Sequence, residues 1–352
     1  MGTDRIQSLQ ALRYVAAAMV VVGHACRLAA GAGAGNLPAD IGVAGVDIFF
    51  VLSGFVIALT GPLATPRPTG ALFFWRRWRR VAPIYYLVSI VAIVDAANQG
   101  PLSTDRIIST LLFWPAAGRV AIPPYVMVGW TLGFEMIFYS TVALVLLGGR
   151  LRRNLILLGT AMLCLEVGRQ VNGSPPFRIL ANPIFLEFSA GVGLAAIWPR
   201  LRSAPRALAG ILLLSGVGAL AVLSVAGLKG ADSVFATLND SEGLWRVLVF
   251  GFPAVSIVAG VAILDRGFTG TLADLGAKLG DASYSIYLTQ LMVLSPVIFI
   301  SAGMPILARA ALGLVAATLA GFIVFRFVET PILRDLKRLR LPRANIPAFA
   351  AE

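Results

Sequence analysis

Long apolar runs, each interrupted by charge, proline or glycine, constrain this chain more than any other feature. A helix needs about 20 apolar residues to cross the hydrocarbon layer of a membrane. The sequence predicts ten such helices, at approximately 10–29, 43–61, 81–97, 126–148, 155–169, 179–198, 207–227, 245–264, 284–302 and 307–328. A further apolar piece, 107–114, is too short to span and indicates an interfacial or re-entrant segment. The predicted fold class is therefore all-α, a polytopic integral membrane protein of about ten transmembrane helices.

Composition agrees with a membrane protein and excludes several other classes. Only 13% of the residues are charged, against roughly 25% in soluble domains. The net charge of +12 is spread in short clusters between apolar runs, so we expect no nucleic-acid partner. Cys26 and Cys164 are far apart and form no disulfide framework. With one histidine and scattered carboxylates, we also expect no metal site.

Basic residues mark the side of the membrane on which each loop lies, because Lys and Arg accumulate in cytoplasmic loops. Segments on one side carry 20 of the 29 Lys and Arg residues, and the intervening loops carry 8. This alternation favours ten helices with both termini in the cytoplasm. We expect one membrane domain over 1–335 and a basic, disordered cytoplasmic tail over 336–352. No internal repeat is evident, which weighs against transporters built from duplicated halves.

Arg13 and His24, in the first predicted span, are candidate functional residues because ionisable groups inside a membrane are costly. They are eleven residues apart, about 16 Å and almost three whole helical turns, so they share one face. An arginine there can bind a phosphate, and a neutral imidazole can accept a proton from an alcohol. A snorkelling arginine beside a packing histidine is the alternative.

The second span opens with Gly45–Phe55, in which Asp47 lies near the outer end. Its carboxylate is placed to orient or charge-pair His24. An aspartate favoured by the dipole at a helix start is the alternative. The Ser53–Gly54 pair indicates close helix packing rather than chemistry.

Arg76, Arg77 and Arg80 lie just before the third predicted span, in an aromatic and basic segment. In a helix Arg76 and Arg80 share a face, and planar guanidinium groups so placed can clamp a phosphate. The alternative is the positive charge and aromatic belt of an ordinary membrane boundary.

Glu135 lies about nine residues into the fourth span, close to the bilayer midplane, where it needs a partner. Other polar groups inside spans are Asn182, Glu187, Tyr284, Tyr287, Gln290, Arg326 and Glu329.

Together these segments resemble the membrane acyltransferase 3 family, which acylates sugars of exopolysaccharide, lipopolysaccharide and related envelope glycans. The matching motifs, in chain order, are Arg13 to His24, Gly45 to Phe55, Arg76 to Arg80, Trp130 to Tyr139, Ser283 to Leu288 and Glu329 to Pro331. The resemblance covers about residues 5–335 and is greatest to stand-alone exopolysaccharide acetyltransferases. One departure is Gln290, which stands where relatives usually have a second histidine. An amide can hydrogen-bond but cannot act as a base.

The resemblance implies an O-acetyltransferase of the bacterial inner membrane. Acetyl-CoA would be a cytoplasmic co-substrate rather than a bound cofactor, and the partners would be a polysaccharide or lipid-linked glycan acceptor and the lipid bilayer. His24 would be the general base or an acylated nucleophile, and Asp47 would orient it or compensate its charge. The third catalytic residue, Glu135, would position a substrate or hold a second helix in place. The residues implied for the CoA phosphates are Arg13, Arg76, Arg77 and Arg80. Those implied for substrate binding are Trp130, Tyr139, Tyr287 and Gln290.

Two other classes of protein remain as alternatives. A transporter or flippase for a lipid-linked sugar would use His24, Asp47 and Glu135 as a proton relay. A purely structural membrane scaffold would explain neither the buried Glu135 nor the alignment of Arg13 with His24.

Overall fold

The computed structural model describes residues 6–31, 41–64, 68–114, 121–147, 179–180, 182–226 and 243–338. Within these ranges every regular element is a helix. The elements are α1 (Gln7–Ala30), α2 (Ile41–Thr60), α3 (Gly70–Gln99), α4 (Thr104–Leu112), η3 (Met127–Gly129), α5 (Trp130–Val145), α8 (Phe185–Leu201), α9 (Arg206–Val225), α11 (Gly243–Arg246), η4 (Val247–Gly251), α12 (Phe252–Leu264), η5 (Asp265–Gly267), α13 (Thr271–Ile300), α14 (Ile306–Val324), η6 (Phe325–Glu329) and α15 (Thr330–Arg338). The segments η4 and η6 are single π-helical turns, and η3 and η5 are 3₁₀ turns.

Seven stretches of the described chain are long and apolar enough to cross a membrane. They are Gln7–Ala30, Gly70–Gln99, Met127–Val145, Arg206–Val225, Leu244–Gly267, Thr271–Ile300 and Ile306–Arg338. The predicted count of ten is not confirmed. The apolar part of α2, Ala44–Thr60, is shorter, and α8 has 17 residues. The predicted span at 155–169 lies outside the described residues.

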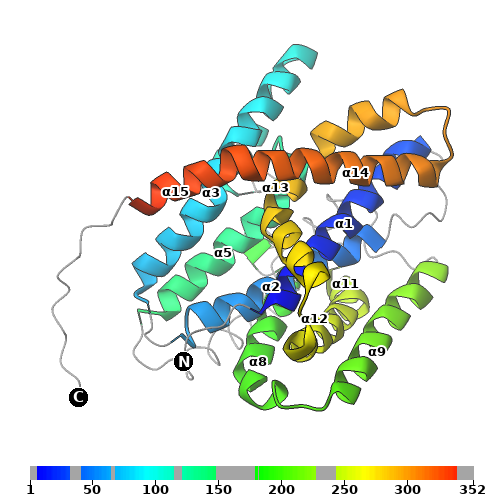
Figure 1. Cartoon of the computed structure of the whole chain (residues 1–352). Coiled ribbons are helices and arrows are strands. Elements are labelled where there is room, and N and C mark those ends of the chain that lie inside the picture. Colours follow the sequence, from blue (N-terminus) through cyan, green and yellow to red (C-terminus); the bar gives the residue numbers. More distant parts are fainter. Residues whose placement is uncertain are drawn as a thin grey trace.

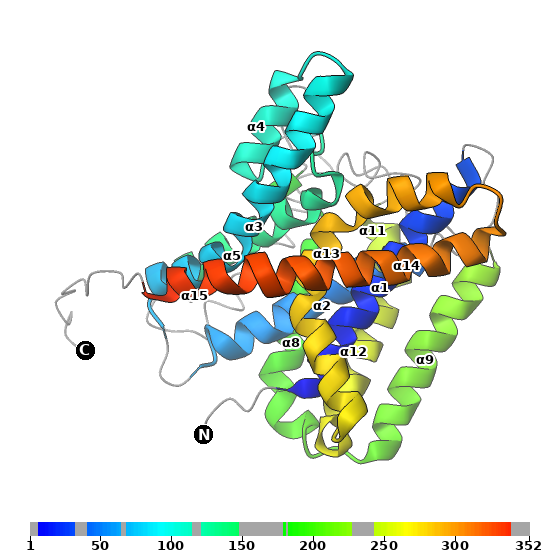
Figure 2. The same ribbon diagram turned by 45° about the horizontal axis from the view of Figure 1, so that its top comes forward.

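Helix α1 occupies the middle of the bundle, where α2, α13 and α14 pack against it (Figure 1). Helices α14 and α15 continue through η6 as one long rod across the molecule (Figure 2). The predicted boundary at residue 335 falls inside α15, and 339–352 lie outside the described part. Helix α9 packs on α12 and exposes most of its apolar surface, as a lipid-facing helix does.

Helix α3 begins earlier than the sequence predicts. The apolar run starts at residue 81, but the helix starts at Gly70, because the Thr69 side chain accepts a hydrogen bond from the backbone N–H of Leu72. The arginine cluster therefore lies on the helix itself and not in a preceding loop. The segment predicted at 107–114 forms α4, a nine-residue amphipathic helix beside α3 (Figure 2), where Tyr86 donates to the Leu111 carbonyl.

Glycines allow the tightest helix contacts. A Cβ on Gly54 of α2 would lie 2.0 Å from the carbonyl oxygen of Phe188, and a Cβ on Gly191 of α8 would lie 2.1 Å from that of Val51. The predicted close packing at Gly54 is confirmed. Because lipid is as apolar as a side chain, such van der Waals contact is a main source of helix association in a membrane.

An aromatic cluster fills the space between α2, α5 and α8. Phe188 lies 4.8 Å from Phe50 and 4.5 Å from Phe138, measured between ring centroids. Trp130, at the start of α5, meets Phe50 and Phe134 edge to face. This packing fixes the position of α5, the helix that carries Glu135.

Candidate active site

Polar side chains from five helices line a cavity at the end of the bundle where α3 begins. Its volume, counted together with the solvent at its open mouth, is about 580 Å³. The polar residues of this arginine cavity are Gln10, Arg13, Ser53, Arg77, Arg80, Glu135, Tyr139 and Tyr284. Helix α1 supplies Arg13, α2 supplies Ser53, α3 supplies Arg77 and Arg80, α5 supplies Glu135 and Tyr139, and α13 supplies Tyr284.

A second cavity, of about 450 Å³ with the solvent at its mouth included, adjoins the first and shares Arg13, Glu135 and Tyr284 with it. The polar residues of this tyrosine cavity are Arg13, Thr131, Glu135, Ser283, Tyr284 and Tyr287. Because the two cavities share residues, they form one polar track that leads from the arginines of α3 to Tyr287 in the bundle interior.

Glu135 is the carboxylate of this track. Its Oε1 accepts a hydrogen bond of 2.7 Å from Ser53, and its Oε2 accepts one of 3.0 Å from Tyr139. The partner that the sequence requires for Glu135 is thus found. Ser53, for which the sequence indicated packing, instead holds this carboxylate, so a polar role was missed there.

Arg13 lies at the junction of the two cavities, and its Nε is buried without a hydrogen-bond partner in the described part of the chain. A buried guanidinium N–H left unpaired by the protein is a donor available to a ligand. The four arginines assigned to phosphate binding divide between two places. Arg77 and Arg80 face the arginine cavity, while Arg76 and Arg77 line a surface pocket with Thr60, Pro68, Phe73 and Arg79.

His24 lies farther along α1 and lines neither cavity. Its Nδ1 is 3.1 Å from Oε1 of Gln290, whose Nε2 donates to the backbone carbonyl of Tyr287 at 2.9 Å. The second hydrogen bond fixes the orientation of the amide, so Oε1 faces the imidazole and Nδ1 is the protonated nitrogen. Nε2 is then the basic nitrogen. Gln290 therefore orients His24, although it cannot itself take a proton.

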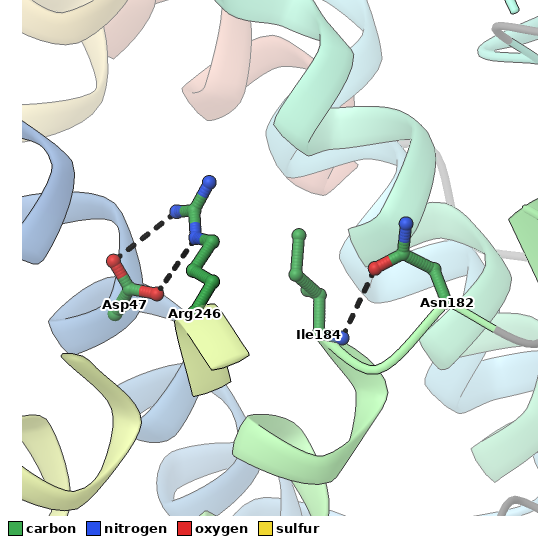
Figure 3. A network of polar contacts seen from close by, with 4 residues as sticks. All are labelled: Asp47, Asn182, Ile184 and Arg246. Carbon is green, nitrogen blue, oxygen red and sulfur yellow. Dashed lines mark hydrogen bonds and ion pairs between the residues drawn. The ribbon is translucent and has the colours of Figure 1, made fainter. Parts of the chain in front are cut away.

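Asp47 does not contact His24 as the sequence suggested. It is fully buried and binds Arg246 of α11 through two contacts, Nε to Oδ1 at 3.2 Å and Nη2 to Oδ2 at 3.1 Å (Figure 3). Buried Glu187 interacts electrostatically with both. The predicted pairing failed because Asp47 and Arg246 are 199 residues apart in the chain, and spacing along the chain does not report how distant helices pack.

The Asp47–Arg246 pair supports the wall behind the tyrosine cavity. The Arg246 guanidinium lies 5.9 Å from the centre of the Trp130 ring, and the π-helical turn η4 follows Arg246 directly. Such turns are frequent at functional sites. Trp130 packs here and lines neither cavity, whereas Tyr139 lines the arginine cavity and Tyr287 the tyrosine cavity. The sequence signal that could have identified this cluster was Arg246 itself, an arginine inside the apolar run predicted at 245–264.

The arrangement combines an anion-binding end with an interior acid–base group. Arginines bind phosphates through charge-assisted hydrogen bonds. Within the described ranges, no three His, Cys, Asp or Glu side chains come together as a metal site requires.

Comparisons with known proteins identify the family to which the chain belongs. The model of a family described as an acyltransferase domain, acyltransferase 3, matches residues 6–326. The chain is also 32% identical over 323 residues to the exopolysaccharide production protein ExoZ of Rhizobium meliloti (strain 1021), an alignment covering 89% of this chain and 96% of that protein. No solved structure matches. With its apolar helices, the chain is a multi-pass membrane protein, and it belongs to the acyltransferase 3 family.

Proposed function

We propose that this protein transfers an acetyl group from acetyl-CoA, bound from the cytoplasm, to a hydroxyl of an exopolysaccharide sugar, free or lipid-linked. The family supports acyl transfer, and the name of the relative from Rhizobium meliloti supports an exopolysaccharide acceptor. The alternation of loop charge supports a bacterial inner-membrane location with both termini in the cytoplasm.

The observation that carries the proposal is the polar track itself. Arg77 and Arg80 lie at one end and Arg13 farther in, so an anionic donor held by its phosphates would extend its thioester toward Glu135 and Tyr287. The surface pocket with Arg76 and Arg79 adds positive charge beside the entrance. Electrostatic attraction of a polyanion to this end follows from the same charges.

The transfer needs one base. The hydroxyl oxygen of the acceptor bonds to the thioester carbon, the carbon–sulfur bond breaks, and the hydroxyl proton passes through the base to the departing sulfur. Glu135 lies in both cavities and is placed for this role. His24 is a second candidate because Gln290 leaves its Nε2 basic, although it lies about 16 Å along α1 from Arg13.

A proton relay for a flippase finds less support. His24, Asp47 and Glu135 have separate partners, namely Gln290, Arg246 and the Ser53–Tyr139 pair, and no hydrogen bond joins any two of the three among the described residues.

The experiment is acetyl transfer by the purified protein in detergent, from radiolabelled acetyl-CoA to alkali-deacylated exopolysaccharide. We expect Glu135→Gln to abolish turnover and Arg80→Ala to raise KM for acetyl-CoA. Arg202→Ala, an exposed arginine away from the track, is the matched control and should behave as the parent. If His24→Ala abolishes turnover and Glu135→Gln does not, His24 is the base. If the parent neither binds nor uses acetyl-CoA, the proposed function is wrong.

A further inference from the structure

One hydroxyl among the residues that line the tyrosine cavity makes no hydrogen bond within the described part of the chain. Tyr284 donates to the Val81 carbonyl at 2.7 Å, and Thr131 and Tyr287 both bond to the Val128 carbonyl, at 3.0 and 3.1 Å. Ser283 is fully buried, yet its Oγ has no hydrogen-bond partner anywhere in the described chain. A buried hydroxyl without a partner costs free energy, so its retention calls for an explanation.

Three other helical serines of the described chain satisfy their hydroxyls within their own helix. Ser140, Ser189 and Ser295 each donate to the carbonyl four residues earlier, at 2.8 to 3.0 Å. Ser295 belongs to the same helix as Ser283, so α13 permits this bond. Ser283 does not make it, and its side chain lines the cavity that also holds Glu135.

Arg13 lines the same cavity and carries a second unpaired donor. Its Nε is buried and, within the described residues, unpartnered, so the wall of one cavity contains two free donors and a carboxylate. Arg13, Ser283 and Glu135 line one cavity, and unpaired donors beside a base can stabilise a negatively charged oxygen during acyl transfer.

We propose that Ser283 Oγ and Arg13 Nε donate hydrogen bonds to the acyl carbonyl oxygen of the bound thioester. The inference rests on the proposed function. When the acceptor oxygen adds to the carbonyl carbon, the carbonyl electron pair moves onto its oxygen, and these two donors stabilise the charge. When the pair returns, the carbon–sulfur bond breaks, and the sulfur takes the acceptor's proton from Glu135.

Binding and turnover test Ser283 separately. CoA lacks the acyl carbonyl, so Ser283→Ala should leave the Kd for CoA unchanged. The Kd for acetyl-CoA should rise by about two- to tenfold, the effect of losing one hydrogen bond. The value of kcat should fall about 10²- to 10³-fold, as when an oxyanion donor is removed. Ser295→Ala, on the same helix but exposed, should match the parent in both assays. Thermal unfolding of each variant checks its fold.

The outcomes are distinct. A folded Ser283→Ala protein with the parent's kcat and the parent's ratio of CoA to acetyl-CoA affinity would overturn the inference and leave the proposed function intact. An acetyl group found on Ser283 by peptide mass spectrometry would also overturn it, since Ser283 would then be a nucleophile. If Ser283→Ala does not fold, Ser283→Cys, nearly the same shape with a weak donor, should bind CoA normally and turn over slowly. A parent that binds no CoA would overturn the proposed function, and this inference with it.

Discussion

Removing Arg246 should destabilise the protein more than removing Asp47, although the two form one ion pair. Arg246 is 3% exposed and Asp47 is fully buried, and two N–O contacts of 3.1 and 3.2 Å join them. With Arg246→Met, two neighbouring acidic side chains, Asp47 and Glu187, lose the cation that lies beside them. Breaking a buried pair this way costs about 3–5 kcal/mol. With Asp47→Asn, Glu187 still compensates Arg246, and the loss should be about 1–3 kcal/mol.

The free energy of unfolding can be measured in mixed detergent micelles by denaturant titration, followed by circular dichroism. The double variant Asp47→Asn with Arg246→Met should lose less than the sum of the single losses, because it leaves one fewer unpaired charge. Asp335→Asn is the control, since its 3.6 Å pair with Arg338 is 73% and 77% exposed and should contribute nothing measurable. If Arg246→Met costs no more than Asp335→Asn, the pair does not support the fold as argued.

Three further predictions follow from single contacts. Gly191→Ala should destabilise the α2–α8 contact by about 1–3 kcal/mol, because the new Cβ would lie 2.1 Å from a backbone oxygen. Gly193→Ala, on the same helix, is the control, since its Cβ would meet nothing within 4 Å. Unfolding titrations of the two variants test this, and equal losses of unfolding free energy would contradict it. Gln290→Leu should shift the ¹⁵N resonances of the His24 imidazole, because the hydrogen bond that fixes its tautomer is lost. Unaltered ¹⁵N chemical shifts would refute the assigned tautomer. Arg80→Lys should raise KM for acetyl-CoA, since a point charge replaces a planar fork, and a KM equal to the parent's would show that Arg80 does not bind phosphate.

Hydropathy predicted where the helices lie better than which side chains meet. The apolar runs predicted α1, α9 and α14 to within four residues at each end, because apolar length is a local property. Hydropathy misplaced the start of α3, because the arginines interrupt the apolar run. The helix nevertheless begins at Gly70, where Thr69 caps it. The polar track could be outlined in advance because Arg13 and Glu135 are conspicuous in apolar surroundings.

The partners of those residues depend on how distant helices pack, and spacing along the chain does not report this. Asp47 was assigned to His24 on a neighbouring helix, whereas its partner Arg246 is 199 residues away. Ser283 could not be singled out from sequence either. An unpaired hydroxyl is recognised only when every neighbouring donor and acceptor has been placed.

The most direct test of the central claim uses membrane vesicles of known orientation. Radiolabelled acetyl-CoA does not cross a bilayer, so its side can be chosen, and label on exopolysaccharide is then measured for the parent and for Arg80→Ala. We expect label only when acetyl-CoA is on the face where α3 begins, the cytoplasmic face in this account, with much less for Arg80→Ala at the same concentration. Labelled exopolysaccharide formed when acetyl-CoA is on the opposite face would contradict the assignment of the arginine cavity to the acyl donor. Equal labelling of exopolysaccharide by the parent and by Arg80→Ala would contradict it as well.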